Sequence, residues 1–353
     1  MHTWSENPKK DIFQHLEMLS YQKNCEKLLC GKIKSERKND SLNVSSIDKK
    51  RAKEMSFCIK QGIEFFKNSE NADLSISPLL IYYGILSLSK ALIIANSSKK
   101  LYLDDISYHG LTTKPLNEEQ NNQKKEKKKW NLLNEYANVN DGVFFELAKT
   151  LNIALNKKDI IKFKSTFSSI PELKNLIDKL RIFDSNCINC YSELDEKNKK
   201  TTFAIYSMDS EKLESKFPNI TKEFNKQPMH GSPFFTKYIS NNNCSYSDFK
   251  YFYSYNSFIG GKYFVFPVEI YRDNNKENIL LPQIIIDYIN FFILSEQVRY
   301  HQDNWNMILN GKNDAIVSVI KIYIEYVKRR FPNFILNYLF NESFTYGSPA
   351  FLS

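Results

Sequence analysis

The sequence predicts a mainly α-helical fold of the α+β class with a small inserted β element, from three observations. The stretch from Leu79 to Ala95 is apolar apart from one glycine, two serines and one lysine, and a helix that is apolar on all sides is buried. Glycine and proline are scarce, at 10 and 11 of 353 residues, which disfavours dinucleotide-binding and β-sandwich folds that use glycine at turns. Aromatic segments that alternate with polar residues gather after residue 200, which is typical of strands.

The N-terminal part of the chain reads as helical. Apolar residues recur near helical period in 11–29 and in 47–67. The apolar helix then begins at Ser77-Pro78, where a capping hydroxyl precedes a proline in the first turn. Small residues follow each other along it at helical spacing, and they would let a second helix approach closely: Gly84, Ser87, Ala91 and Ala95.

Lys90 is the single charge inside the apolar helix. Burying an ammonium group without partners is costly, so polar groups should converge there. Tyr83 and Ser87 adjoin Lys90 on the same helix. The alternative is that the Lys90 stem lies along apolar surface while its head reaches solvent.

The middle of the chain mixes loops with short helices. The segment 102–111 reads as a loop that ends in His109, a residue that either anchors the loop or contributes to a site. Lysine- and asparagine-rich sequence at about 112–130 has almost no apolar residues, which predicts a mobile loop. Short helices are expected over 144–155 and 171–180.

Three aromatic segments predict strands at 201–208, 247–255 and 262–271, with a short helix at 209–217. The helical pattern resumes at Leu281 and runs, with a break, to Leu309. A last helix is expected from Asp314 to about Arg330, closing at Phe331-Pro332.

We therefore expect three regions. Residues 1–200 form a helical N-terminal region, residues 201–278 form the β-containing insertion, and the C-terminal helices of residues 279–345 pack on the N-terminal helical core.

The charge balance is compatible with anionic partners. The formal net charge is +9, from 49 Lys and Arg against 40 Asp and Glu. Much of the excess lies in two lysine-rich runs, at 32–53 and 124–129, and such runs are usually solvated linkers.

Cysteine usage and motifs limit the chemistry. Cys187 and Cys190 form the only CxxC, and a structural zinc site needs a second pair of ligands, so we expect neither a metal nor a cofactor. The chain contains no GxxxxGK[ST], HExxH or GxGxxG motif, which argues against a P-loop, a zinc protease and a dinucleotide fold. With no secretory signal pattern at Met1, we expect a cytoplasmic protein.

The apolar stretch 79–95 could also be considered as a membrane span. A span needs about 20 predominantly apolar residues, and this stretch is shorter and carries Lys90. We therefore interpret it as a core helix, with no membrane partner.

Several blocks together resemble a known bacterial family, the YaaC-like proteins. They occur in family order over residues 50–345 and read SPLLIYYGILSLSKALI, HGL, DGVFFEL, IPEL, LSEQVRYHQDNWNMIL and KRRFPNFILNYL. The resemblance implies a helical protein but no particular reaction. The helix pattern SPLLxYYxxLxLxKA further resembles helices of HEPN-type domains, a class that includes metal-independent ribonucleases and toxins of antiphage systems, so a HEPN-like core is expected by analogy.

The HEPN-type ribonuclease signature is an arginine, four to six residues, then a histidine near a helix end. Here only one residue separates Arg299 from His301. Side chains at i and i+2 of a helix point about 200° apart, so Arg299 and His301 cannot converge within one helix. A ribonuclease site would need the helix to end near Tyr300, or would need His109 to supply the imidazole in place of His301. Otherwise Arg299 would pair with Asp303, His301 would be an ordinary exposed or core-satisfied side chain, and Trp305 would be core.

Two hypotheses follow from these residues. In the favoured one, a non-catalytic helical protein binds a nucleotide, a nucleic acid or a protein through a basic pocket of Tyr83, Lys90, His109 and Arg299. In the alternative, Arg299 acts with His301 or His109 as a HEPN-like ribonuclease, RNA is the substrate and antiphage defence is the setting. A homodimer is compatible with either hypothesis.

Overall fold

A computed structural model describes most of the chain. The described residues are 2–4, 7–37, 49–97, 99–113, 130–182, 190–197, 200–207, 210–216, 220–228, 236–240, 253–254, 263–264, 266–311, 314–341 and 344–347. Residues 114–129 of the mobile loop predicted at about 112–130 lie outside them, as do Cys187 and the side chain of Cys190.

Helices make up most of the described structure, as the sequence predicts. The α-helices are α1 (Pro8–Met18), α2 (Gln22–Arg37), α3 (Lys49–Ser69), α4 (Ser77–Asn96), α5 (Val143–Thr150), α6 (Phe163–Phe167), α7 (Pro171–Leu180), α8 (Ser210–Lys216), α9 (Ile220–Glu223), α10 (Gln283–Tyr300), α11 (Gln302–Leu309) and α12 (Asp314–Phe340). Two 3₁₀ turns, η2 (Leu103–Ile106) and η3 (Leu132–Asn134), accompany them.

The strands form two antiparallel sheets and one short parallel pair. They are β1 (His2–Trp4), β2 (His109–Thr112), β3 (Tyr136–Gly142), β4 (Ile160–Lys162), β5 (Cys190–Lys197), β6 (Lys200–Ser207), β7 (Phe224–Pro228), β8 (Thr236–Ser240), β9 (Tyr253–Ser254), β10 (Tyr263–Phe264), β11 (Phe266–Arg272), β12 (Asn275–Leu281) and β13 (Thr345–Gly347). The six-stranded sheet has the order β7-β8-β6-β5-β10-β9, and the five-stranded sheet has the order β12-β11-β4-β3-β2. Strands β1 and β13 pair in parallel.

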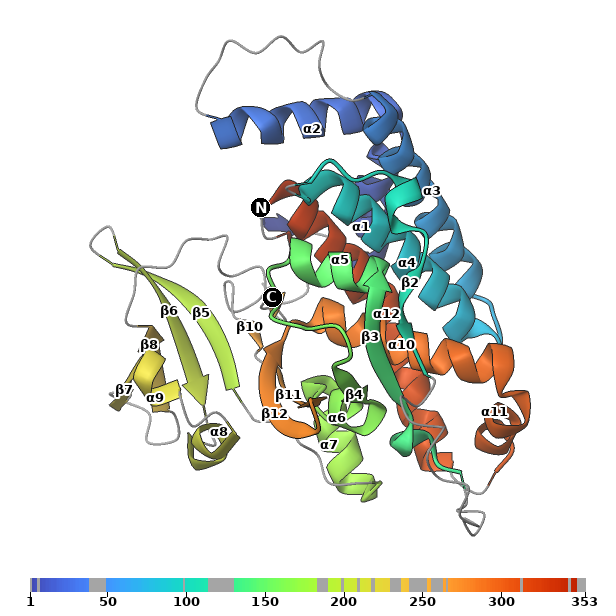
Figure 1. The fold of residues 1–353 in the computed structure, drawn as a ribbon, viewed down its shortest axis with the longest axis vertical. Coiled ribbons are helices and arrows are strands. Elements are labelled where there is room, and N and C mark those ends of the chain that lie inside the picture. Colours follow the sequence, from blue (N-terminus) through green and yellow to red (C-terminus); the bar gives the residue numbers. More distant parts are fainter. Residues whose placement is uncertain are drawn as a thin grey trace.

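The apolar helix α4 is the centre of the fold. Helices α3, α5, α10 and α12 pack around it, and Figure 1 shows it inside the helical body. By length and composition α4 could cross a membrane, but 78% of its most apolar window is buried inside the structure.

Helices α3 and α4 approach each other at a pair of glycines. A Cβ added to Gly84 would lie 2.7 Å from the ring of Phe66, and one added to Gly62 would lie 2.7 Å from Leu88. Gly84, in the row of small residues on α4, therefore serves close packing against α3.

A buried polar network joins α10 to α12. The Asp287 carboxylate, which is fully buried, accepts hydrogen bonds from Arg330 at 2.8 Å and from Tyr323 at 2.7 Å. Gln283 donates to the same carboxylate at 2.7 Å. Because each of these groups is buried and hydrogen-bonded, the network fixes how the two helices pack.

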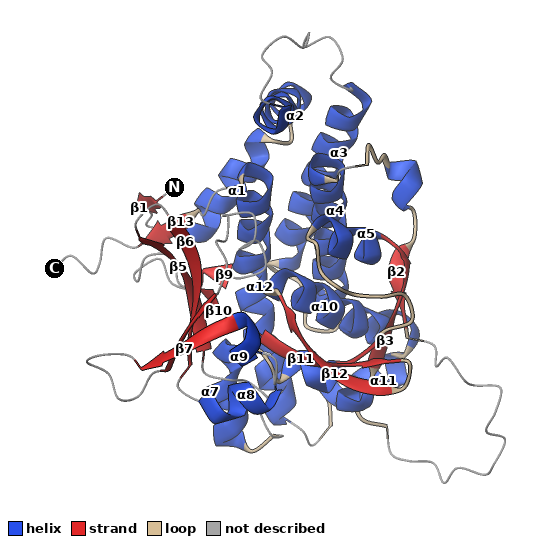
Figure 2. Cartoon of the chain, turned by 60° about the vertical axis from the view of Figure 1, so that its left-hand side comes forward, coloured by secondary structure: helices blue, strands red, loops and turns tan. Residues whose placement is uncertain are grey.

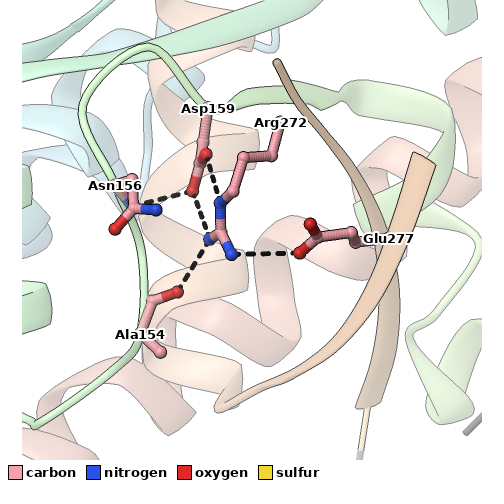
Figure 3. A network of polar contacts seen from close by, with 5 residues as sticks. All are labelled: Ala154, Asn156, Asp159, Arg272 and Glu277. Atoms are coloured by element: carbon pink, nitrogen blue, oxygen red, sulfur yellow. Dashed lines mark hydrogen bonds and ion pairs between the residues drawn. The ribbon is translucent and has the colours of Figure 1, made fainter. Parts of the chain in front are cut away.

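The hairpin of β11 and β12 is held to the loop before β4 by Arg272. Its guanidinium donates to both carboxylate oxygens of Asp159, at 2.9 and 2.8 Å. It also donates to the Ala154 carbonyl at 3.0 Å and to Glu277 at 3.0 Å, as Figure 3 shows. The backbone N–H of Asn156 donates to Asp159 at 2.8 Å, which completes the contacts of that buried carboxylate.

The described elements correct several sequence-based expectations. The lysine-rich run 32–53 is not wholly a loop, because α2 continues to Arg37 and α3 begins at Lys49. Strands occur outside 201–278 as well, among them β2, β3, β4 and β5. Strands β2 and β4 were missed because they are short, and β3 because it is rich in residues that disfavour strands. Figure 2 shows both sheets beside the helical body.

The last long helix does not close at Pro332. Helix α12 continues to Phe340 with Pro332 in its interior. The residues after the proline are buried apolar side chains, including Ile335, Leu336 and Leu339, and their packing outweighs the hydrogen bond that proline cannot donate.

Candidate functional site

One stripe of α4 remains partly exposed on a helix that is otherwise buried. It includes Leu79, Tyr83 and Lys90, which are spaced by four and seven residues and so lie on one face. Lys90 is half-buried, so the structure does not enclose it as it encloses most of the helix. This stripe is the base of the candidate site.

Helix α3 forms one side of this stripe. The ring of Phe65 stacks on Tyr83 with 5.4 Å between centroids, and Ser87 donates a hydrogen bond to Gln61 at 3.0 Å. The charge of Lys90 acts on Cys58, but burial dominates and raises the pKa of that thiol to about 12. Cys58 is therefore a packed thiol and not a reactive one.

His109 lies on the other side, at the start of β2. Its Nδ1 is 2.9 Å from the hydroxyl of Tyr82, and the hydroxyl of Tyr288 donates to its backbone carbonyl at 3.0 Å. Burial lowers the pKa of His109, and the positive charges of Arg299 and Lys90 lower it further. The charges of Arg299 and Lys90 thus both reach the imidazole of His109.

Arg299, in the last turn of α10, completes the group. Its guanidinium carbon is 5.7 Å from the centre of the Tyr82 ring and 5.9 Å from that of Tyr83. Its charge partner is Glu296, one turn earlier, and not Asp303. Burial raises the pKa of Glu296, whose carboxylate also accepts a hydrogen bond from Thr113 at 3.3 Å.

His301 stands apart from the group. Helix α10 ends at Tyr300, and His301 is the exposed residue between α10 and α11. It acts electrostatically on Glu296 and lowers the pKa of that carboxyl group. The helix thus ends where the sequence argument required, but the imidazole beside Arg299 is that of His109.

Three participating residues were not predicted: Tyr82, Tyr288 and Glu296. Tyr82 and Tyr288 are fully buried and carry hydroxyls that meet His109, and burial raises the pKa of both. Glu296 could have been found, because it precedes Arg299 by three residues on a predicted helix. The two tyrosines look like ordinary core residues in the sequence.

The cluster combines two cations, a neutral imidazole, tyrosine rings and one carboxylate. Arginine and lysine near an imidazole are suited to bind phosphate or carboxylate oxygens. Among the described residues, no group of three or more His, Cys, Asp or Glu side chains is placed to hold a metal ion. The cluster therefore has the side-chain chemistry that an anionic group needs.

Comparison with known proteins gives a family relationship. The model of the family described as YaaC-like Protein matches residues 18–339. No curated protein and no solved structure matches the chain.

Proposed function

The chain belongs to the YaaC-like protein family, and from this premise we propose that it binds a phosphate-bearing ligand, a nucleotide or a nucleic acid, at the cluster of Tyr83, Lys90, His109 and Arg299. The observation that carries the proposal is that the guanidinium of Arg299 and the imidazole of His109 both lie against Tyr82, and the charge of Lys90 also acts on that imidazole. A bound anion offsets the positive charge that both cations place on this imidazole. The net charge of +9 favours the approach of such a ligand.

The arrangement of Arg299 supports binding more than catalysis. Tyr82 and Tyr83 lie within 6 Å of its guanidinium and Glu296 pairs with it, so the group is pre-oriented. A pre-oriented guanidinium loses little conformational entropy when it binds an oxyanion. Binding of an acidic protein surface to the same cations is the alternative that experiment must distinguish from binding of a phosphate-bearing ligand.

A HEPN-like ribonuclease, with a HEPN-like core and a role in antiphage defence, remains the second candidate. Two observations favour it: Arg299 and His109 both contact Tyr82, and α10 ends just before His301. In this reading the neutral imidazole of His109 accepts a proton from a ribose hydroxyl while Arg299 stabilises charge on the phosphate. This reading makes RNA the substrate.

We propose a cytoplasmic location. The described cysteines Cys25, Cys30 and Cys58 are free thiols, as in a reducing compartment. A homodimer stays a prediction.

The binding proposal is tested by titrating the purified protein calorimetrically with inorganic tripolyphosphate. We expect binding that weakens at least tenfold in Arg299→Gln and in Lys90→Gln. Lys164→Gln is the matched control, because Lys164 is an exposed lysine on α6, which contributes nothing to the cluster. Failure of tripolyphosphate to bind, or equal binding by all variants, contradicts the proposal.

A cell-based test separates binding from catalysis. Wild type, Arg299→Gln and His109→Gln are expressed and total RNA is examined on gels. Intact RNA in every culture supports the binding function, and nucleotides that co-purify with the protein are then identified by mass spectrometry. RNA cleavage that requires Arg299 and His109 would establish the ribonuclease instead.

A further inference from the structure

A cavity of about 530 Å³ opens beside the cluster, between the start of α4 and the junction of α10 with α11. This volume lies within the range of about 300–1,000 Å³ that is usual for small-molecule sites. The residues that line it include Leu79, Val298, Arg299, Gln302, Trp305 and Asn306.

The walls of the cavity are fixed before any ligand binds. The indole Nε1–H of Trp305 donates to the backbone carbonyl of Ser75 at 3.2 Å, which ties α11 to the loop before α4. The backbone N–H of Trp305 donates to the carbonyl of His301 at 2.9 Å, across the α10–α11 junction. A pre-formed site spends little binding energy on ordering.

The lining suits a flat heterocycle. Leu79 and Val298 give apolar walls, whereas Gln302 and Asn306 bring carboxamide groups to the exposed side. Asn310 donates to the Asn306 side-chain oxygen, which orients that amide. A carboxamide offers a donor beside an acceptor, the pattern that pairs with N6 and N7 of adenine, whereas guanine offers two acceptors there.

Arg299 belongs both to the cavity and to the cluster around Tyr82 and His109. It lines the cavity, and its guanidinium also stands over Tyr82, whose hydroxyl meets His109. Along α4, the rise of about 1.5 Å per residue puts Lys90 roughly 16 Å from Leu79. One ligand that spans this distance needs a ring at one end and a chain of anionic groups at the other.

We propose that the cavity between α4, α10 and α11 binds the adenine ring of a nucleoside polyphosphate, whose phosphates extend past Arg299 toward His109 and Lys90. This assignment rests on the proposed anion-binding function and adds the identity of the ligand. Leu79 and Val298 hold the faces of the ring, Gln302 reads its edge, and Arg299 binds the first phosphates.

The experiment compares ADP with inorganic pyrophosphate by calorimetry on the full chain. Both carry a diphosphate, so their difference reports the nucleoside alone. We expect ADP to bind at least tenfold more tightly than pyrophosphate. Leu79→Trp, which fills the cavity, and Gln302→Ala, at an exposed position, should remove this advantage of ADP over pyrophosphate.

Met307→Ala is the matched control, because Met307 is exposed on the same helix α11 but does not line the cavity. Thermal unfolding of each variant shows that it is folded. Equal affinities for ADP and pyrophosphate would overturn the adenine assignment while the anion-binding function stands. Binding of neither probe would overturn the proposed function itself.

Two further probes test the identity of the ligand. GDP binding as tightly as ADP would overturn the reading of the Gln302 amide. Oligoadenylates that bind more tightly with each added nucleotide would overturn the mononucleotide in favour of a nucleic-acid strand, because a site for one base gains nothing from length.

Discussion

The hydroxyl of Tyr82 lies 2.9 Å from Nδ1 of His109, and the same tyrosine ring lies 5.7 Å from the guanidinium carbon of Arg299. Tyr82 thereby connects an imidazole on β2 to a cation on α10. The pKa of His109 is lowered by its burial and by the charges of Arg299 and Lys90, so the ring is neutral at pH 7. An anion bound between the two cations offsets their charges and must raise that pKa again.

The first prediction is that anion affinity rises as the pH falls. The bound state holds the His109 proton more tightly than the free state, so binding takes up a proton. Affinity should strengthen as the pH falls through the pKa of His109 in the complex and level off below its lowered pKa in the free protein. Calorimetric titration with tripolyphosphate between pH 8 and pH 5 measures this.

His109→Gln is the control for that pH dependence. Tripolyphosphate itself takes up protons in this pH range and so contributes to the dependence of affinity on pH in both proteins. The informative quantity is therefore the difference between wild type and His109→Gln in the slope of log affinity against pH. A variant slope equal to that of the wild type would show that His109 is not coupled to the ligand.

The second prediction concerns the competition between Glu296 and the ligand. Glu296 already pairs with the guanidinium of Arg299. Replacing Glu296 with Gln keeps the shape of the side chain but removes the negative charge, so tripolyphosphate should bind more tightly. Because pairs of this kind are worth up to about 1 kcal/mol, the expected gain is about two- to fivefold.

Glu325→Gln provides the matched comparison for Glu296→Gln. Glu325 pairs with Lys328 at the same i,i+3 spacing on α12 and contributes nothing to the cluster. Its substitution should leave affinity unchanged. Weaker binding by Glu296→Gln would mean that the carboxylate positions Arg299 and does not compete for it.

The third prediction concerns the contact between α3 and α4. In Gly84→Ala the new Cβ would lie 2.7 Å from the Phe66 ring, which is itself buried. Overpacking of this kind typically costs about 1–3 kcal/mol. The free energy of unfolding in urea measures it, and Gly84→Leu should cost more.

Gly31→Ala, on α2, separates the packing effect from the change in helix propensity. Nothing lies within 4 Å of a Cβ at Gly31, so the substitution should be neutral or stabilise by about 0.5–1 kcal/mol. If both variants unfolded at the same urea concentration, the glycine contact would not be tight.

Much of the helical frame was predictable because it depends on local pattern. The apolar stretch around Lys90 gives α4 almost to the residue. A break between Leu281 and Leu309 was also expected, and the structure places it after Tyr300. Each of these features is encoded in a short continuous segment.

The features that sequence analysis missed depend on distant contacts. Strand β4 has three residues and pairs with β3 and with β11, and β11 lies more than a hundred residues later in the chain. The conformation of β4 is therefore set by its partner strands and not by its own sequence. Tyr82 and Tyr288 reach His109 only after β2 packs against α4 and α10. Pro332 stays helical because buried residues on both sides of it pack in the core.

The fourth prediction concerns the buried pair of Asp287 and Arg330. Asp287 is fully buried, Arg330 is 3% exposed, and Tyr323 and Gln283 also donate to the carboxylate. In Asp287→Ala the Arg330 charge would lose this buried partner. Removing one member of such a pair typically costs about 3–5 kcal/mol, which denaturant unfolding measures.

The double variant Asp287→Leu with Arg330→Met shows whether the loss is electrostatic. It removes both charges and keeps apolar volume, so it should recover most of the stability that Asp287→Ala loses. Tyr323→Phe takes away only a neutral donor, and its cost should be nearer 1 kcal/mol. A loss below about 1 kcal/mol in Asp287→Ala would mean that Arg330 finds other acceptors or water, and that the network does not fix the packing of α10 on α12.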